Sequence, residues 1–137
     1  MPGWLLKTEP STYSFADLER DGTTVWDGVA NAQALIYLRQ MQPGDQLLIY
    51  HSGDERAVVG RAEIVSTPYP DPQLGDPKRV VVDVQVRQRL PQPIALAAIK
   101  ADPAFAQFGL VRLPRLSVMP VPDELWAKLQ ALRSSLS

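Results

Sequence analysis

The chain has 137 residues, of which 45% are hydrophobic and 21% charged, and it contains no cysteine. These values are typical of one soluble globular domain spanning residues 1–137, and the missing thiols exclude disulfides and fit a cytoplasmic protein. The formal net charge of −1 argues against a uniformly basic surface, and no apolar stretch is long enough for a membrane span, so no membrane partner is expected.

The first third of the chain predicts one strand followed by two helices. Residues 3–9 read as an apolar strand, which Pro10 ends. Ser14, with Asp17 three residues later, has the pattern of a capping box and begins a short helix. Asn31 is the expected N-cap of a second helix. The apolar stripe of that second helix consists of Ala34, Leu35, Leu38 and Met41.

The rest of the chain predicts three strands, a short helix, a last extended segment and a closing helix. Their expected ranges are, in that order, 46–52, 57–66, 79–90, 96–102, 115–121 and the residues from 122 onward. The closing helix is expected to line one side with Leu125, Leu129, Leu132 and Leu136. Because strands and helices mix without regular β-α-β alternation, the fold class is α+β, in the form of a small barrel with helices around it.

Familiar catalytic patterns are missing from the sequence. The single histidine, His51, is followed by Ser52, but neighbours on a strand point to opposite faces and do not form a dyad. One histidine and no cysteine do not make a metal site. Neither a P-loop nor a dinucleotide-binding glycine pattern occurs. We therefore expect no metal, no cofactor and no catalytic residue.

The end of the first strand carries a polar triplet, Lys7, Thr8 and Glu9. Strand alternation places Lys7 and Glu9 on one face, about 7 Å apart, with Thr8 on the opposite face. A lysine and a carboxylate at a pocket edge would hold a polar ligand, and a lysine of lowered pKa would also serve acid–base chemistry. A surface ion pair at a strand end explains the same residues.

The stretch TTVWDGVANAQA places Trp26 and Asp27 beside Gly28 at the approach to a helix. Gly28 has no side chain to cover the indole, so one ring face would be open to stack a base, a contact of about 1–3 kcal/mol. The Asp27 carboxylate would accept from an exocyclic amine. Alternatively, Trp26 is a core residue under a turn, as we expect for Trp4 and Trp126. Further polar contacts are expected from Asn31, Tyr50 and Ser52.

Charge is unevenly distributed along the chain. Residues 1–77 carry five Lys or Arg against eleven Asp or Glu, whereas residues 78–115 carry seven against two. If the basic block gathers on one face, it would meet phosphates there. Arg112 and Arg115 are the expected phosphate contacts, although arginines spread along a solvated strand edge would give the same count.

Taken in order, WLLKTEPSTYSFADLERDGTTVWDGVANAQA, PGDQLLIYHSGD, VVGRAEIV, YPDP and RLSVMPV resemble an EVE domain. The resemblance runs over nearly the whole chain. The family belongs to the PUA-like superfamily and is related to YTH domains, which implies a strongly bent, mixed β-barrel of five or six strands with peripheral helices. It also implies a non-enzymatic module that binds a modified nucleobase, usually modified cytosine in nucleic acid. The implied pocket residues are Lys7, Thr8, Glu9, Trp26, Asp27, Gly28, Tyr50, His51 and Ser52.

The sequence also departs from the family pattern. After the tryptophan, Ala30 replaces an arginine, and Leu35-Ile36 replaces an Arg-Asn pair. The loss of these basic residues weakens the case for binding a nucleic-acid backbone. Leu35 and Ile36 predict instead an apolar patch for a weak homo-oligomer. Two alternative functions follow: an ASCH-like amidohydrolase acting on a modified cytidine through Lys7, Thr8 and Glu9, and a protein-interaction domain using the patch.

Overall fold

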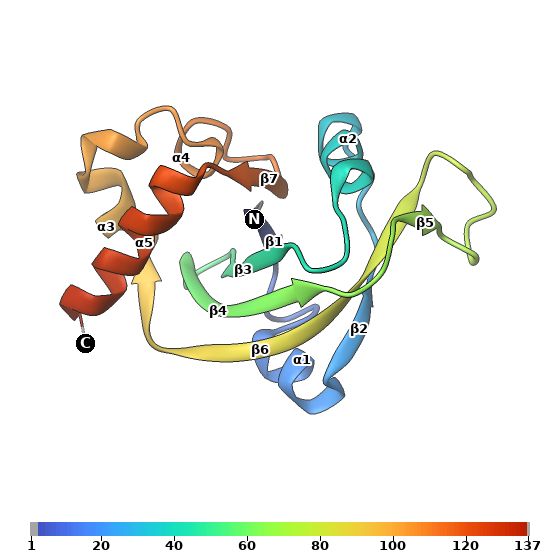
Figure 1. Ribbon diagram of the computed structural model, residues 1–137, viewed down its shortest axis with the longest axis horizontal. Helices are drawn as coiled ribbons and strands as arrows, with labels where there is room; N and C mark the ends of the chain where they lie inside the picture. Colours follow the sequence, from blue (N-terminus) through green and yellow to red (C-terminus); the bar gives the residue numbers. More distant parts are fainter. Residues whose placement is uncertain (1–2, 137) are drawn as a thin grey trace.

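A strongly curved sheet occupies the centre of the structure, and the helices lie around it (Figure 1). The computed structural model describes residues 3–136, with side chains up to residue 132. The strands are β1 (Gly3–Thr8), β2 (Thr23–Trp26), β3 (Gln46–His51), β4 (Ala57–Ile64), β5 (Tyr69–Pro70), β6 (Val80–Ala95) and β7 (Val118–Val121). The helices are α1 (Phe15–Asp21), α2 (Ala32–Gln40), α3 (Leu96–Ala101), α4 (Gly109–Arg112) and α5 (Asp123–Leu136), with a 3₁₀ helix η1 (Pro103–Phe105).

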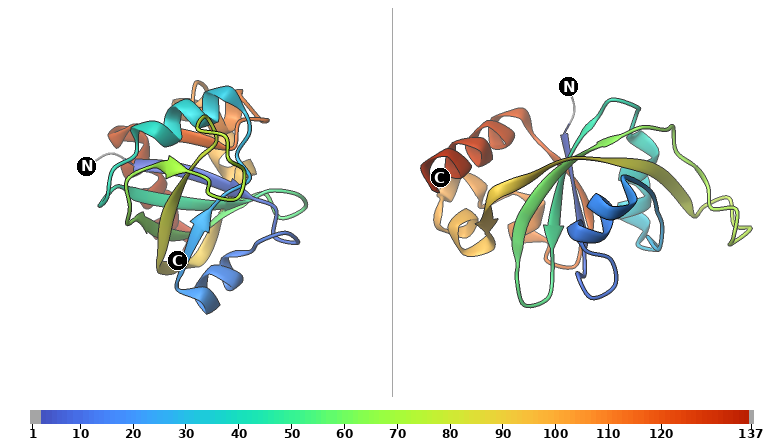
Figure 2. Two further views of the ribbon diagram at one scale, coloured as in Figure 1. Left: turned by 90° about the vertical axis from the view of Figure 1, so that its right-hand side faces the viewer. Right: turned by 90° about the horizontal axis from the view of Figure 1, so that it is seen from below.

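The sheet has the strand order β2-β6-β4-β3-β1-β7, and β5 pairs with β6 outside this path. β1 and β3 run parallel, whereas the other pairs are antiparallel. The long strand β6 sweeps around the molecule and pairs with β2, β4 and β5 (Figure 2). The α+β class is confirmed. The sheet has seven strands rather than five or six, and its path stays open, with β2 at one end and β7 at the other.

Both predicted N-caps are present. The Ser14 hydroxyl accepts from the Asp17 amide at 3.0 Å, and the Asp17 carboxylate accepts from the Ser14 amide at 2.9 Å, so the capping box forms. The Asn31 side chain accepts from the Ala34 amide at 3.0 Å and begins α2. These bonds satisfy amides that have no partner inside the helix, which is why the local pattern located both helices.

Four short elements were not predicted: β2, β5, η1 and α4. β2 has only four residues and exists through its pairing with β6, where Trp26 lies opposite Val82. β6 also runs past its predicted end through Pro91 and Pro93. Its register against β4 shifts between Val58 and Gly60, and a proline is tolerated where a bulge relieves it of a ladder hydrogen bond.

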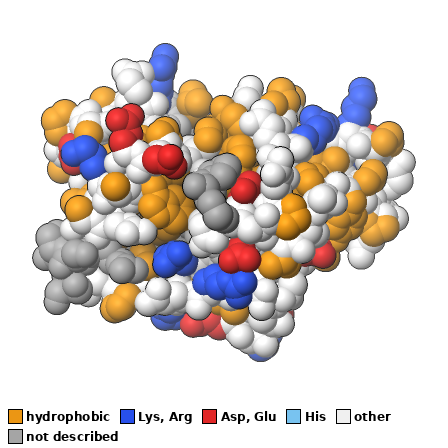
Figure 3. All heavy atoms as spheres, viewed as in Figure 1, with side chains coloured by type: hydrophobic (Ala, Val, Ile, Leu, Met, Phe, Trp, Pro, Cys, Tyr) orange, Lys and Arg blue, Asp and Glu red, His pale blue; other side chains and the backbone are white. Residues whose placement is uncertain are grey.

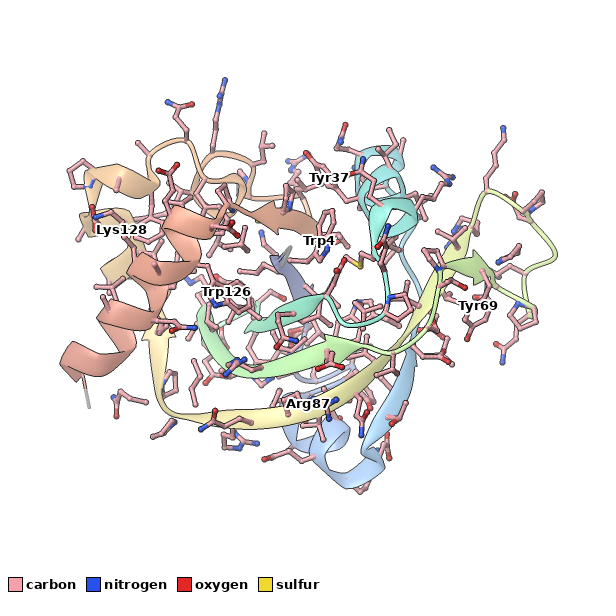
Figure 4. The ribbon with its side chains drawn as sticks, viewed as in Figure 1. Trp4, Tyr37, Tyr69, Arg87, Trp126 and Lys128 are labelled. Atoms are coloured by element: carbon pink, nitrogen blue, oxygen red, sulfur yellow. The ribbon has the colours of Figure 1, made fainter. Side chains whose placement is uncertain are left out.

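The core contains Trp4, which is 5% exposed and donates its indole N–H to the buried Asp45 carboxylate at 2.9 Å. Figure 4 shows Trp4 beside Tyr37 of α2, and their ring centroids are 6.0 Å apart. Trp126 of α5 is half-buried and packs against the core, over Gly3. The prediction that both tryptophans belong to the core is therefore confirmed, with Trp126 at its margin.

The apolar stripe of α2 packs inward, and this corrects the predicted surface patch. Leu35 is 5% exposed because the helical period places it beside Ala34 and Leu38 in the core. Of the two residues of the predicted patch, Ile36 is the exposed one, at 44%. In α5, Leu125 and Leu129 are buried and Leu132 is half-buried, as expected, whereas the Leu136 side chain lies outside the described residues. No helix of the described chain has the length and apolarity to cross a membrane.

Candidate functional site

A cavity of about 520 Å³ lies at the open seam of the sheet, where the C-terminal ends of β1 and β2 meet. It is lined by Lys7, Thr8, Glu9, Thr12, Tyr13, Thr24, Val25, Trp26, Asp27, Gly28, Val29 and Ser117. β2 is one end of the strand path, and β1 with β7 forms the other. The sheet therefore curls until its two edges face each other across this cavity.

The cavity brings together six of the ten residues predicted for the site: Lys7, Thr8, Glu9, Trp26, Asp27 and Gly28. The other four, Asn31, Tyr50, His51 and Ser52, do not line it. Two segments far apart in sequence thus line one cavity, and β3, the strand that follows α2, pairs with β1.

Lys7 is held by the backbone next to β7 and by an aromatic ring. Its ammonium donates to the Pro114 carbonyl at 2.9 Å and lies 5.7 Å from the centroid of the Tyr50 ring, within the range of a cation–π contact. Burial lowers the pKa of Lys7. An ammonium has three protons, so Lys7 retains donors for a ligand in a partly desolvated position, where a hydrogen bond is stronger than in water.

Thr8 and Glu9 both line the cavity, although alternation predicted opposite faces for them. β1 ends at Thr8 and the chain turns at Glu9, whose carbonyl accepts from the Tyr13 amide at 2.9 Å. The Thr8 hydroxyl donates to the Tyr13 carbonyl at 2.6 Å. One Glu9 carboxylate oxygen accepts from the Ser11 amide and hydroxyl, at 3.2 and 2.9 Å. Both side chains thus fix the loop after β1, which contributes Thr12 and Tyr13 to the cavity lining.

Trp26 is both a core residue and part of the cavity wall. It is 7% exposed and belongs to the hydrophobic core, yet it lines the cavity. The Tyr13 ring meets the Trp26 ring at 90°, with centroids 6.3 Å apart. The Tyr13 hydroxyl donates to Asp21 at 2.9 Å, which anchors the ring from behind. Trp26 and Tyr13 together form an aromatic corner of the cavity.

Asp27 and Gly28 follow Trp26 at the rim, and both are exposed. Gly28 has a φ of 78°, and no atom lies within 4 Å of the position that a Cβ would take. The glycine is therefore explained by its left-handed backbone, not by a need to uncover the indole. Within residues 3–132 the Asp27 carboxylate has no hydrogen-bond partner, so it is free to accept from a ligand.

His51 supports the site from behind. Its Nε2 accepts from the Phe15 amide at 2.9 Å, and its Nδ1 lies 2.7 Å from a Glu55 carboxylate oxygen. His51 is 6% exposed and Tyr50 is 3% exposed. The Ser52 amide donates to the Thr8 carbonyl at 3.0 Å. These three residues hold α1, Lys7 and the end of β1 in place.

Six lining residues were not predicted: Thr12, Tyr13, Thr24, Val25, Val29 and Ser117. Val25 and Thr24 flank the predicted tryptophan on a strand too short to be recognised. Ser117 comes from the far end of the chain, where its carbonyl accepts from the Lys7 amide at 2.9 Å. No local sequence pattern predicts that Ser117 lies beside Lys7.

The basic side chains of residues 78–115 do not form one continuous basic surface. Arg87 pairs with Glu63 at 3.1 Å, and Arg89 pairs with Glu19. On the face shown in Figure 3, basic side chains are scattered and several lie next to acidic ones; Figure 4 labels Arg87 on β6. Arg112 and Arg115 are exposed and lie elsewhere, in the segment before β7. Among the described side chains, no group of three metal ligands occurs.

A strongly curved, open sheet surrounded by helices is an α+β fold of the PUA-like type. The family model described as EVE domain matches residues 3–132. The chain belongs to the EVE domain family, and the resemblance inferred from its motifs is confirmed.

Relatives are similar over most of the chain. Thymocyte nuclear protein 1 of Gallus gallus is 34% identical over 155 residues, covering 88% of this chain and 64% of that protein, so the chain spans less than two thirds of that relative. The solution structure of Rpa0253 from Rhodopseudomonas palustris has a TM-score of 0.92 and 37% identity, covering 100% of this chain and 96% of that one.

Two further structures bear on function. Human THYN1 in complex with 5-methylcytosine-containing DNA has a TM-score of 0.88 and 29% identity, covering 97% of this chain and 98% of that one. An ASCH protein from Zymomonas mobilis has a TM-score of 0.61 and 14% identity, covering 95% and 94%, and shares the fold alone.

Proposed function

We propose that the chain is a binding module that holds a modified cytosine of nucleic acid in the cavity between β1 and β2. The observation that carries the proposal is the cavity itself, of about 520 Å³, whose lining combines an aromatic corner with the Lys7 and Asp27 side chains. That volume falls within the range of about 300–1,000 Å³ typical of small-ligand sites. Human THYN1, bound to 5-methylcytosine-containing DNA in its structure, supports the same ligand class here.

The polar groups match the edge of cytosine. The unpartnered Asp27 carboxylate would accept from the N4 amine, and the Lys7 ammonium would donate to N3 or O2. Thymine presents a carbonyl where cytosine has its amine, so it would leave Asp27 facing an acceptor. Unsatisfied polar groups discriminate strongly, whereas a buried methyl adds only about 0.8 kcal/mol. Asp27 would therefore select the base, and the cavity walls would accommodate its modification.

The aromatic corner would bind the flat face of the base. Trp26 is mostly buried, so the guest would contact the part of the indole that reaches the cavity, together with the Tyr13 ring. Base–aromatic contacts contribute about 1–3 kcal/mol each. Val25 and Val29, which also line the cavity, would provide apolar contacts for a methyl substituent.

The test is a titration with DNA oligomers that carry plain, methylated or hydroxymethylated cytosine. Trp26→Phe keeps an aromatic ring in the core but shortens the wall, so we expect affinity to fall about fivefold to tenfold, equivalent to about 1–1.4 kcal/mol. Asp27→Asn should reduce the preference for cytosine over thymine. Trp126→Phe, at the core margin away from the cavity, is the matched control and should bind as the wild type does. Equal affinity of all variants, or no binding by the wild type, would contradict the proposal.

A second candidate is hydrolysis of an amide on a modified cytidine. One observation favours it: Lys7, Thr8 and Glu9 line the same cavity, and burial lowers the pKa of Lys7. Against a nucleophilic role, the Thr8 hydroxyl already donates to the Tyr13 carbonyl. Incubation with N4-acylated cytidine decides between the two: turnover that Lys7→Ala abolishes would establish the hydrolase, and intact substrate would support the binding module.

A further inference from the structure

A second hollow, of about 550 Å³, lies next to the base cavity. Its lining includes Asn31, Arg112, Leu113, Pro114, Arg115 and Leu116. We call it the flanking groove. It is built by the start of α2, the end of α4 and the segment between α4 and β7, of which Leu116 is buried in the core.

The flanking groove and the base cavity share a wall. Lys7 lines the cavity and donates to the carbonyl of Pro114, which lines the groove, at 2.9 Å. Leu116 in the groove precedes Ser117 in the cavity, and Val29 in the cavity lies two residues before Asn31 in the groove. A polymeric ligand with one unit bound in the cavity would therefore place its next unit in the groove.

The sign of the charge changes between the two hollows. The base cavity contains the carboxylates of Glu9 and Asp27 beside a single lysine, whereas the groove contains Arg112 and Arg115 and no acidic lining residue. Carboxylates repel a phosphate, and guanidinium groups bind it through charge-assisted hydrogen bonds. The cavity thus suits a neutral base, and the groove suits the phosphate that follows it.

Both groove arginines remain available. Arg112 donates to the Gln107 side chain at 2.7 Å, which orients the guanidinium without neutralising it. Within the described part of the chain, Arg115 makes no hydrogen bond or ion pair. Arg87 and Arg89, in contrast, are neutralised by Glu63 and Glu19. The groove therefore holds basic charge that no acidic side chain of the protein compensates.

The rest of the groove is apolar. Leu113 is 49% exposed, and Pro114 is also exposed. An exposed leucine beside a proline gives a surface on which a deoxyribose or the neighbouring base can pack. A hollow lined by exposed apolar residues and two arginines offers contacts to both the sugar and the phosphate of a nucleic-acid backbone.

We propose that the flanking groove binds the sugar–phosphate backbone next to the recognised base, through Arg112 and Arg115, so that the ligand is a nucleic-acid strand and not a free nucleoside. This inference rests on the proposed function of the adjacent cavity.

The experiment compares a single-stranded DNA oligomer containing one 5-methylcytosine with the nucleoside 5-methyl-2′-deoxycytidine. For the double variant Arg112→Gln/Arg115→Gln we expect at least tenfold weaker binding of the oligomer and unchanged binding of the nucleoside. The plot of log affinity against log salt should become shallower by roughly 1.4, because each lost single-strand phosphate contact removes about 0.7. Arg115→Gln alone breaks no described contact and should show about half the change in slope. Arg87→Gln, which removes an ion-paired arginine, is the control and should leave the slope unchanged.

The outcomes separate the two proposals. Wild-type protein that binds nucleoside and oligomer equally, or a double variant with unaltered salt dependence, would overturn the groove assignment while the base cavity stands. Oligomer binding that depends on the arginines but ignores cytosine methylation would support the groove and contradict the base-recognition proposal. Thermal melting of each variant verifies that the fold is intact before binding is compared.

Discussion

His51 provides a direct test of which residues hold the site and which bind the ligand. Its Nε2 accepts from the Phe15 amide, one of the first-turn N–H groups of α1 that have no partner within the helix. His51→Ala leaves that buried donor without an acceptor, at a cost of about 1–3 kcal/mol, and also leaves the space of a buried ring. We expect a total loss of about 2–4 kcal/mol in the free energy of unfolding.

At roughly 3 °C per kcal/mol for a domain of this size, His51→Ala should lower the melting temperature by about 6–12 °C. His51→Gln keeps an acceptor for Phe15 and should lose only about 1 kcal/mol. Glu55→Gln is the control, because that carboxylate is 44% exposed and its pairing contributes little. Urea unfolding followed by circular dichroism gives the three free energies. His51→Ala protein with wild-type stability and lost ligand binding would refute the supporting role and place the imidazole in contact with the ligand.

Two further predictions concern the sheet. The hydrogen bond from Tyr69 to the Asp83 carboxylate, 2.6 Å long, raises the pKa of Tyr69 from 10.0 to about 12. The stability that this bond provides is complete below pH 10 and is lost between pH 10 and about 12. Urea midpoints should therefore fall less steeply with pH in Tyr69→Phe than in the wild type, and parallel curves for both proteins would contradict this. The Phe15 ring packs directly on Gly60, so Gly60→Ala should lower the free energy of unfolding in urea by about 1–3 kcal/mol. The control is Gly109→Ala, which should change stability by less than about 0.5 kcal/mol because its methyl would meet the flexible Met119 side chain at 3.2 Å. Equal effects of the two substitutions would exclude overlap with the Phe15 ring as the cause.

Local patterns predicted the elements whose signals lie within a few residues. The Ser14 and Asn31 caps fixed the starts of α1 and α2, because a cap and its amide are three residues apart. The predicted strands at 46–52, 57–66 and 79–90 correspond to β3, β4 and the first part of β6. β2 was missed because four residues carry too little periodicity, and its order comes from pairing with β6 some sixty residues later.

The site was predictable to the extent that its residues follow one another in sequence. Lys7 to Glu9 and Trp26 to Gly28 each form a run, and the structure brings both runs to one cavity. Tyr13 and Ser117 escaped prediction because their positions depend on how the sheet curls. Tyr50 and His51 were expected in the pocket from the family resemblance, but β3 lies between β1 and β4 in the sheet and both side chains are buried.

The two interpretations of Trp26, core residue and pocket wall, are compatible in a sheet that does not close. A residue at the end of an edge strand packs one side against the core and presents the remainder to the gap between the edges. The 7% exposure of Trp26 is what such a position produces, and it determines how the residue can be tested. Trp26→Ala would remove a core side chain at a cost of about 3–5 kcal/mol, so lost binding in that variant would report unfolding. Trp26→Phe preserves most of the packing, and a weaker affinity at unchanged melting temperature would then measure the ring's contact with the base.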